Sequence, residues 1–245
     1  GAQRMIAAGC MDGVDAVFGA HVSPDLPLGT VGVRYGKFYA ASDTFSITLR
    51  GKSAHGAEPE KGIDALAAAA ELVGTLLALP GRREERCVLS VGTLQAGTAI
   101  NVIAETAKLT GILRTLGQQN RQEMRTLLRE TTQEIAARRS CSAEILLHES
   151  YPGVVNTQAE TALAERTAQA VLGEAQVVRL AQPTMTTEDF GYFIDAAAGC
   201  FYHIGAGCAI PLHNPAFLPD ARAISVAAAV HAAVAETYLM QHPER

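Results

Sequence analysis

The stretch that decides the fold reads SDTFSITLR over residues 42–50, where apolar and polar side chains alternate. In an extended chain, Phe45, Ile47 and Leu49 fall on one face, and Thr44, Ser46 and Thr48, which alternate with them, fall on the other. This period of two predicts a half-buried strand, with its apolar face turned toward a core.

The residues after this strand predict a helix, two strands, a second helix and a last strand. These elements are a helix over 63–77 that Pro80-Gly81 ends, strands over 86–95 and 105–114, a helix with Met124, Leu127, Leu128 and Ile135 on one face, and a strand over 141–147. The order is that of the ferredoxin-like βαββαβ unit, an antiparallel sheet covered on one face by two helices. We therefore predict a separate domain over residues 38–150.

The flanks of this domain have a different pattern. Short apolar runs at 14–20 and 201–205 are bounded by glycines, which is typical of strands buried on both faces. Helical patterns at 159–172 and 221–240 alternate with them. The flanks thus predict one α/β sheet domain that the ferredoxin-like domain interrupts. Its two parts are residues 1–37 and 151–245.

The composition excludes several classes of protein. The 245 residues carry a net charge of −5, which gives no electrostatic basis for binding nucleic acid or an anionic membrane. No apolar run is expected to span a bilayer, because the alanine-rich stretches at 67–70 and 227–229 lie in helical patterns broken by polar residues. The cysteines lack the spacing of a disulfide framework or of a Cys-x-x-Cys metal site, and they predict reduced thiols in a cytoplasmic protein. They are Cys10, Cys87, Cys141, Cys200 and Cys208.

Two histidines follow predicted strands of the α/β domain. His21 comes directly after FGA at 18–20, and His213 lies in the loop PLHNP at 211–215. Ligands usually bind at the ends of buried strands in such a sheet, and neutral imidazole is a common zinc ligand. Spacing alone favours a plainer alternative, in which each histidine sits in a loop and makes one hydrogen bond.

The predicted insert carries three further candidates. His55 lies in GKSAHGA at 51–57, where small neighbours let a substrate approach, although a tight turn explains the same residues. Asn101 and Arg114 come from facing strands. Asparagine can donate to a carbonyl and arginine can hold a carboxylate at two points, whereas a surface charge at a strand end is the plainer account of Arg114.

One candidate lies in a predicted helix start. The stretch TTEDF at 186–190 predicts the first turn of a helix, with Thr187 as N-cap and two acidic residues that favour a helix N-terminus. Capping explains this pattern, and Glu188 is also a candidate for lining a site. The remaining histidines have no neighbours that single them out. They are His148, His203, His231 and His242.

Six short motifs occur along the chain. They are GAH at 19–21, GKSAHGAEP at 51–59, GTAINVI at 97–103, GILR at 111–114, EDF at 188–190 and HNPAF at 213–217. Together, in this order and at this spacing, they resemble the zinc amidohydrolase and peptidase family of aminoacylases, hippurate hydrolases, indole-acetyl-amino-acid hydrolases and carboxypeptidase G-type enzymes. Each motif is weak alone, but six in register are specific, and the similarity covers essentially the whole chain.

The resemblance implies an α/β metallopeptidase catalytic domain with two divalent cations, either zinc or, at similar ligand sets, manganese or cobalt. It also implies that the ferredoxin-like insert is a lid that forms a homodimer. The implied roles are metal ligands at His21 and His213, donors to the scissile carbonyl at His55 and Asn101 with His55 reaching the partner subunit's site, a hold on the substrate carboxylate at Arg114, and a place near substrate or metal for Glu188.

The histidine at position 21, where other branches of the family carry an acid, implies a preference for N-acyl amino acids. The implied reaction is hydrolysis of their amide bond by a metal-bound water. A dipeptidase or carboxypeptidase of the same family stays open as an alternative. A non-catalytic dimerisation or binding module, with sheets paired edge to edge, is the alternative outside enzymes.

The chain departs from the family pattern in two places. Ala104 replaces the usual proline after Asn101-Val102-Ile103. The family's upstream Cys-Gly-His-Asp metal motif and Glu-Glu pair, which supply the general base and metal ligands, do not occur in the sequence. We therefore expect a chain truncated at its N-terminus that binds zinc poorly and is hydrolytically inactive on its own.

Overall fold

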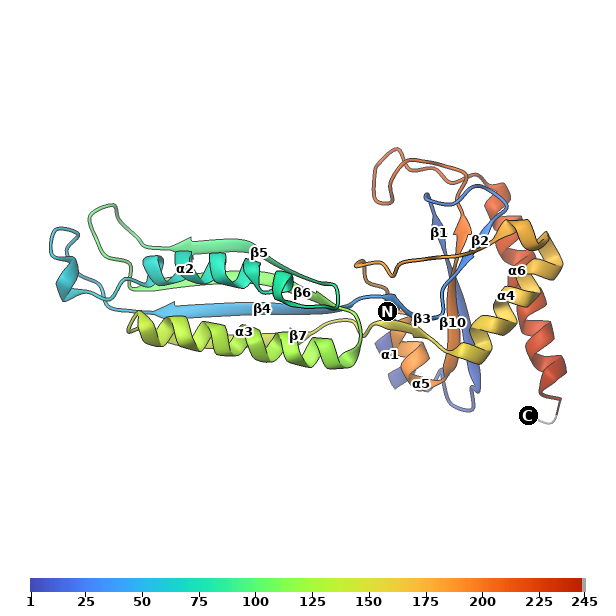
Figure 1. The fold of residues 1–245 in the computed structure, drawn as a ribbon, viewed down its shortest axis with the longest axis horizontal. Helices are drawn as coiled ribbons and strands as arrows, with labels where there is room; N and C mark the ends of the chain where they lie inside the picture. Colours follow the sequence, from blue (N-terminus) through green and yellow to red (C-terminus); the bar gives the residue numbers. More distant parts are fainter. Residues whose placement is uncertain (244–245) are drawn as a thin grey trace. The chain divides into compact units, whose positions relative to one another are not determined.

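The structure is a computed structural model that describes residues 1–243, and these form two compact units. Unit 1 comprises Gly1–Tyr39, Val154–Thr184 and the residues from Glu188 on, and unit 2 comprises Ala40–Gly153 and Met185–Thr187. Both are drawn in Figure 1. The main segment of unit 2 begins and ends a few residues later than the expected 38–150, and the expectation did not include 185–187.

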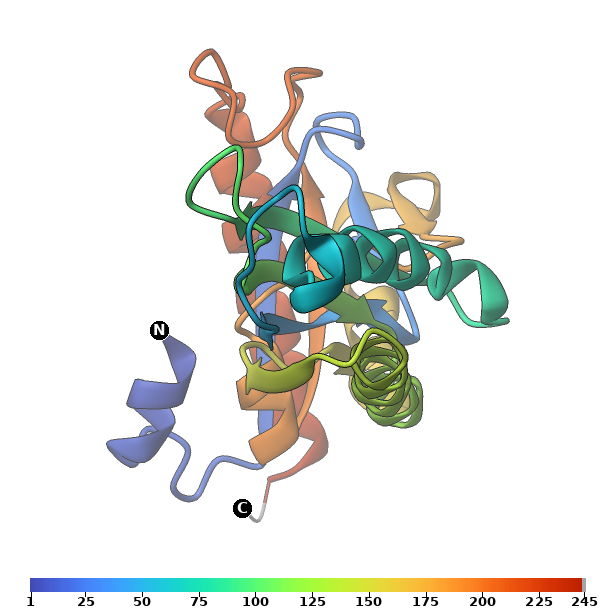
Figure 2. The same ribbon diagram turned by 90° about the vertical axis from the view of Figure 1, so that its left-hand side faces the viewer.

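Unit 2 is a four-stranded antiparallel sheet with two helices side by side on one face (Figures 1 and 2). In chain order its elements are β4 (Ala41–Arg50), α2 (Ala65–Ala78), β5 (Cys87–Ala96), β6 (Thr106–Thr115), α3 (Gln118–Arg138) and β7 (Ser142–Glu149). The strand order β5-β6-β4-β7, antiparallel at every step, is that of a ferredoxin-like fold. The element order predicted from the sequence is confirmed.

The alternation in β4 creates the core of unit 2. Phe45, Ile47 and Leu49 are at most 3% exposed and pack in one hydrophobic cluster with Leu72 of α2 and Leu128 of α3. Burying each such side chain stabilises the fold by about 1.5–3 kcal/mol. The period of two therefore decides which face of the sheet the helices cover.

A buried ion pair fixes α3 to the start of β4. Arg121 donates from Nε and Nη2 to the two carboxylate oxygens of Asp43, at 3.0 and 2.9 Å, and Nη2 also donates to the carbonyl of Ser42 at 3.1 Å. The Arg121 side chain is 5% exposed and the Asp43 side chain is fully buried. A bidentate geometry with a further acceptor is the arrangement that best offsets the cost of removing two charges from water.

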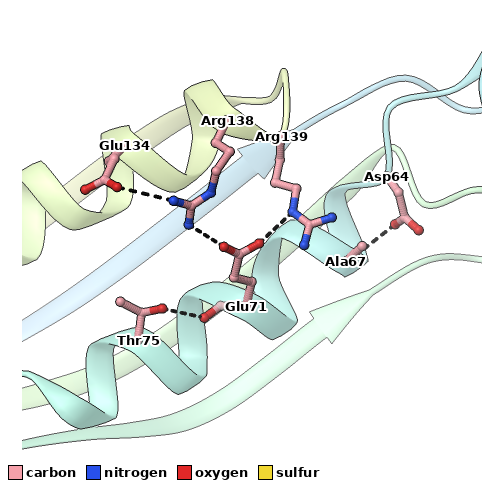
Figure 3. A network of polar contacts seen from close by, with 7 residues as sticks. All are labelled: Asp64, Ala67, Glu71, Thr75, Glu134, Arg138 and Arg139. Carbon is pink, nitrogen blue, oxygen red and sulfur yellow. Dashed lines mark hydrogen bonds and ion pairs between the residues drawn. The ribbon is translucent and has the colours of Figure 1, made fainter.

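A second polar network joins α3 to α2 at their solvent side (Figure 3). Glu71 of α2 accepts hydrogen bonds from Arg139, at 2.6 Å, and from Arg138, which also pairs with Glu134. These two hydrogen bonds hold the pKa of Glu71 below its usual range. Because the two arginines lie at the end of α3, the network ties that end to the middle of α2.

Unit 1 is built on a four-stranded sheet of order β1-β10-β2-β9, beside a two-stranded sheet of β3 and β8. Helices α4 and α6 lie together on one face of the larger sheet, and α1 and α5 lie on the other (Figure 1). The elements are α1 (Ala2–Ala7), β1 (Ala16–Ser23), β2 (Val31–Val33), β3 (Gly36–Tyr39), β8 (Val154–Asn156), α4 (Gln158–Leu172), β9 (Val177–Arg179), α5 (Gly191–Ala196), β10 (Ala198–Gly205) and α6 (Arg222–Gln241).

Two sequence predictions for unit 1 are wrong. Strand β1 is not buried on both faces: most of its residues are half-buried, because it is the edge strand of its sheet among the residues described, whereas β10 lies between β1 and β2. The stretch 186–190 does not open a helix either. Helix α5 begins at Gly191 without a side-chain cap, and the Thr187 hydroxyl instead accepts a hydrogen bond from Arg114.

Helix α6 lies where the sequence predicted a helix, but its composition is more apolar than expected. By length and composition it is the one helix among residues 1–243 that is apolar enough to cross a membrane, and no such stretch was expected. Ala223, Val230 and Val234 on one side of α6 are buried in the core cluster that includes Leu163 of α4 and Tyr202 of β10. In this structure α6 therefore packs as a helix of unit 1.

Candidate functional site

His21 lies on β1 directly beside His203 of β10, because the two parallel strands pair in register. Paired residues on neighbouring strands point to the same face, so both imidazoles lie on one face of the sheet. Nδ1 of His21 is 2.7 Å from the carbonyl oxygen of Val22. A carbonyl only accepts hydrogen bonds, so Nδ1 carries the proton and Nε2 of the neutral ring keeps its lone pair. Metal-binding histidines are commonly held in this way through the other ring nitrogen.

His203 forms a buried pair with Tyr39, which the sequence analysis did not identify. The Tyr39 hydroxyl lies 2.5 Å from Nε2 of His203, and the Phe38 ring centroid lies 4.7 Å from that of the imidazole. Burial, with a smaller effect of His21, lowers the pKa of His203 to about 4. Burial also raises the pKa of the Tyr39 hydroxyl, and the negative charge of Glu188 raises it further. The pair is therefore neutral near pH 7 and lies within electrostatic range of Glu188.

The segment around Glu188 packs against β1. Phe190 lies over Gly19, and a Cβ at Gly19 would overlap the Phe190 ring, so glycine is needed two residues before His21. Oε1 of Glu188 accepts from the Phe190 amide at 3.3 Å, and Asp189 accepts from the Ala2 amide at 2.9 Å. The two acidic residues thus have different partners, and Glu188 is the one near Tyr39.

His213 lies in the loop that leaves the carboxyl end of β10. Strands β1 and β10 run parallel, so their carboxyl ends lie at the same end of the sheet. The loop with His213 therefore starts close to the point where β1 ends, two residues after His21. The His213 backbone has a φ of 67° and is left-handed. Among the described non-glycine residues, only Ser140 also has a positive φ. Turn hydrogen bonds follow it, including one at 2.9 Å from the Phe217 amide to the Asn214 carbonyl. The His213 side chain is exposed.

A metal ion fits these residues in part. His21 presents a bare Nε2, as a ligand must. Within residues 1–243, however, no group of three or more His, Cys, Asp and Glu side chains lies close enough together to hold a metal ion. The described chain therefore offers individual imidazole ligands and not a complete coordination shell.

In unit 2, the His55 turn is held against the Asn101 loop. His55 and Val102 form a β-bridge, and the Gly56 amide donates to the Asn101 carbonyl at 2.7 Å. A Cβ on Gly56 would lie only 3.0 Å from that oxygen, so glycine permits the close approach. The structure therefore brings together two candidates that the sequence supplied in separate motifs.

Arg114 of β6 is held by the short segment 185–187. Its Nη1 donates to the carbonyl of Met185 at 3.1 Å and to the hydroxyl of Thr187 at 3.4 Å. The guanidinium is half-buried, so it is not the freely solvated strand-end charge of the plainer alternative. Because arginine has five N–H donors in a fixed plane, holding one nitrogen orients the rest of the group.

Comparison with known proteins adds to this geometry. The family model described as peptidase family M20/M25/M40 matches residues 1–237. Two proteins of Bacillus subtilis (strain 168) are 34% identical to the chain: an N-acetyl-L-cysteine deacetylase over 227 residues, covering 91% of the chain, and an N-acetylcysteine deacetylase over 238 residues, covering 96%.

A solved structure is similar over nearly the whole chain. It is the Bacillus subtilis YXEP protein, described as a dinuclear metal binding peptidase of the M20 family, with 33% identity and a TM-score of 0.86 over 98% of the chain. The chain spans 54% and 62% of the length of the two deacetylases and 62% of the YXEP chain.

Proposed function

The chain belongs to peptidase family M20/M25/M40. We propose that the protein is a metal-dependent amidohydrolase that cleaves the amide bond of N-acyl amino acids. The observation that carries the proposal is the form of His21: its Nδ1 is bound to a backbone carbonyl, and its bare Nε2 lies on the sheet face shared with Tyr39 and His203. The two similar deacetylases, which by name act on N-acetylated cysteine, support the choice of substrate class.

The proposal gives each candidate residue a task. His21 and His213 hold metal, and two bound divalent cations, most simply zinc, would supply the Lewis acid that makes water a nucleophile near pH 7. His55 and Asn101 donate hydrogen bonds to the scissile carbonyl oxygen, where negative charge develops. Arg114 holds the free carboxylate of the amino-acid half, and Glu188 lies near the substrate or the metal.

A peptidase is the second candidate. The similar YXEP protein is described as a dinuclear metal binding peptidase, and a dipeptide offers the same carboxylate to Arg114 as an N-acyl amino acid does. The two candidates differ only in what lies on the acyl side of the amide. The alternative of a non-catalytic module loses support, because the deacetylases similar to the chain are hydrolases.

The proposal includes a homodimer formed through unit 2 and a cytoplasmic location. In unit 2, β5 and β7 are the edge strands of the sheet and can pair with a second copy. All five cysteines are free, as expected in a reducing compartment. Light scattering of the purified protein measures the dimer directly.

The test is an assay against matched substrates. It uses the protein prepared at the full length of its similar deacetylases, which we call the complete protein. We expect turnover of N-acetyl amino acids that is lost on chelation and restored by zinc, manganese or cobalt, and that exceeds turnover of the corresponding dipeptides. His21→Ala should remove most of this activity. Equal or faster hydrolysis of dipeptides would favour the peptidase, and activity insensitive to chelation would refute both candidates.

A further inference from the structure

The turn that carries His55 fixes the position of the proton on its ring. The Ala57 amide donates a hydrogen bond to Nδ1 of His55 at 3.1 Å, and the Glu58 amide donates to the His55 carbonyl at 2.8 Å. A backbone amide can only donate, so Nδ1 must present its lone pair. In a neutral imidazole the single proton then resides on Nε2.

His21 shows the opposite arrangement. There a backbone carbonyl accepts from Nδ1 and leaves Nε2 bare, whereas at His55 a backbone amide occupies Nδ1 and leaves Nε2 with its hydrogen. The backbone thus prepares one histidine to offer a lone pair and the other to offer a proton. Lone pairs bind metals and accept protons, and an N–H group stabilises a developing oxyanion.

We infer that the Ala57 amide makes His55 a hydrogen-bond donor through Nε2, and that this excludes His55 as a general base or a metal ligand through that nitrogen. Ala57 is then a positioning residue that acts through the ring it bonds. The inference deepens the proposed function and rests on it in one respect, namely that the acceptor is the carbonyl oxygen of an amide substrate.

Three features of unit 2 agree with a donor. The His55 side chain is exposed, so Nε2–H is available to a ligand. The bond from Gly56 to the Asn101 carbonyl holds a second potential donor, the Asn101 amide, on the adjoining loop. Ala57 lies inside the turn that the Glu58 amide closes, so its N–H is held toward the ring. Two N–H donors supplied by adjoining loops suit an oxygen that gains negative charge during the reaction.

The first test measures the tautomer itself, in the 245-residue chain and without any substrate. Long-range ¹H–¹⁵N NMR correlations distinguish Nε2–H from Nδ1–H. We expect His55 to be Nε2–H in the wild type and in Ala57→Gly, which keeps the amide. In Ala57→Pro, which removes it, the other tautomer should rise about fivefold, as for the loss of one hydrogen bond.

An Nδ1–H signal for His55 in the wild type would overturn the inference. So would identical tautomer ratios in the proline and glycine variants. Because the wild-type spectrum alone can give the first result, the inference stays testable even if Ala57→Pro fails to fold.

The second test uses the complete protein and an N-acetyl amino acid. His55→Gln places an amide N–H close to the position of Nε2, whereas His55→Asn places its amide near Nδ1. We expect His55→Ala and His55→Asn to lose about 100-fold in kcat with little change in KM, and His55→Gln to retain at least about tenfold more activity than either. Glutamine no better than alanine would mean that the lone pair and not the proton is used. Absence of any turnover by the wild type would refute the proposed function and leave the NMR result standing.

Discussion

At the scale of single residues, backbone hydrogen bonds decide which chemistry each candidate histidine can perform. The sequence identified His21 and His55 through their motifs, but the motifs do not tell which ring nitrogen is occupied. That depends on the Val22 carbonyl and the Ala57 amide, and hence on local backbone conformation. Residue types could be predicted here, and their tautomers could not.

The Tyr39–His203 pair allows a test of what buried polar residues contribute. Tyr39→Phe leaves Nε2 of His203 buried without its partner, and we expect the free energy of unfolding to fall by about 1–3 kcal/mol in urea titrations. Tyr202→Phe is the matched control, since Tyr202 makes an equally short 2.5 Å contact with His231 from the neighbouring position of β10.

Both substitutions should destabilise the chain to a similar degree. Only Tyr39→Phe should lower hydrolysis by the complete protein, because Tyr39 and not Tyr202 lies on the face shared with His21 and near Glu188. Equal losses of activity would mean that the pair serves packing alone.

The sequence missed this pair because Tyr39 and His203 are 164 residues apart and meet only through the strand arrangement. The one local signal was a histidine inside an otherwise apolar strand.

At the scale of elements, the buried pair between β4 and α3 should dominate the polar stabilisation of unit 2. Asp43→Asn removes the buried partner of Arg121 and leaves it only the exposed Glu149, 4.0 Å from Nη1, so we expect a loss of about 3 kcal/mol in the free energy of unfolding. Glu144→Gln is the control, because the Arg50–Glu144 pair spans 3.9 Å with both side chains 61% exposed. That variant should change stability by less than about 1 kcal/mol. Similar effects of the two changes would contradict this ranking.

A pH dependence belongs to the contact between α4 and β9. Glu165 accepts two hydrogen bonds from Arg179, at 2.6 and 2.8 Å, and one from the Tyr35 hydroxyl at 2.7 Å. The Arg179 hydrogen bonds are the main cause that lowers the pKa of Glu165 from 4.5. The carboxylate thus stabilises unit 1 above about pH 4.5, and this contribution disappears as pH falls through the lower folded-state pKa.

Thermal unfolding of the wild type and of Glu165→Gln should therefore differ at pH 7, and the difference should disappear as the pH falls through the lowered pKa of Glu165. A difference that persists unchanged in acid would show that the titration of Glu165 is not the cause. Glu160→Gln, on the first turn of the same helix, controls for the loss of a negative charge in α4.

Elements were predictable where a periodic pattern was long. The strand at 42–50 and both helices of unit 2 follow from spacing, because each buries one continuous apolar face. Strands β2, β8 and β9 have three residues each, too few to display a period. The start of α5 was misjudged because Thr187 resembles an N-cap, whereas its hydroxyl bonds Arg114 from a strand 73 residues away.

At the scale of the whole molecule, the described residues provide imidazoles but no cluster of three metal-binding side chains. We expect the 245-residue polypeptide to bind zinc weakly and to show no turnover of N-acetyl amino acids. Isothermal titration of the purified chain measures the affinity, and an assay with added zinc measures the activity. Tight stoichiometric zinc binding together with turnover by this polypeptide would contradict the expectation.

The central claim is that His21 and His213 bind metal together. His21 lies near the carboxyl end of β1, and His213 lies in the loop that follows the carboxyl end of the parallel strand β10. An anomalous difference map of the complete protein, recorded from zinc-loaded crystals at the zinc absorption edge, tests it most directly. We predict peaks at about 2.0–2.1 Å from Nε2 of His21 and from a ring nitrogen of His213. Zinc peaks remote from both imidazoles, in crystals of a protein that hydrolyses N-acyl amino acids, would contradict the assignment.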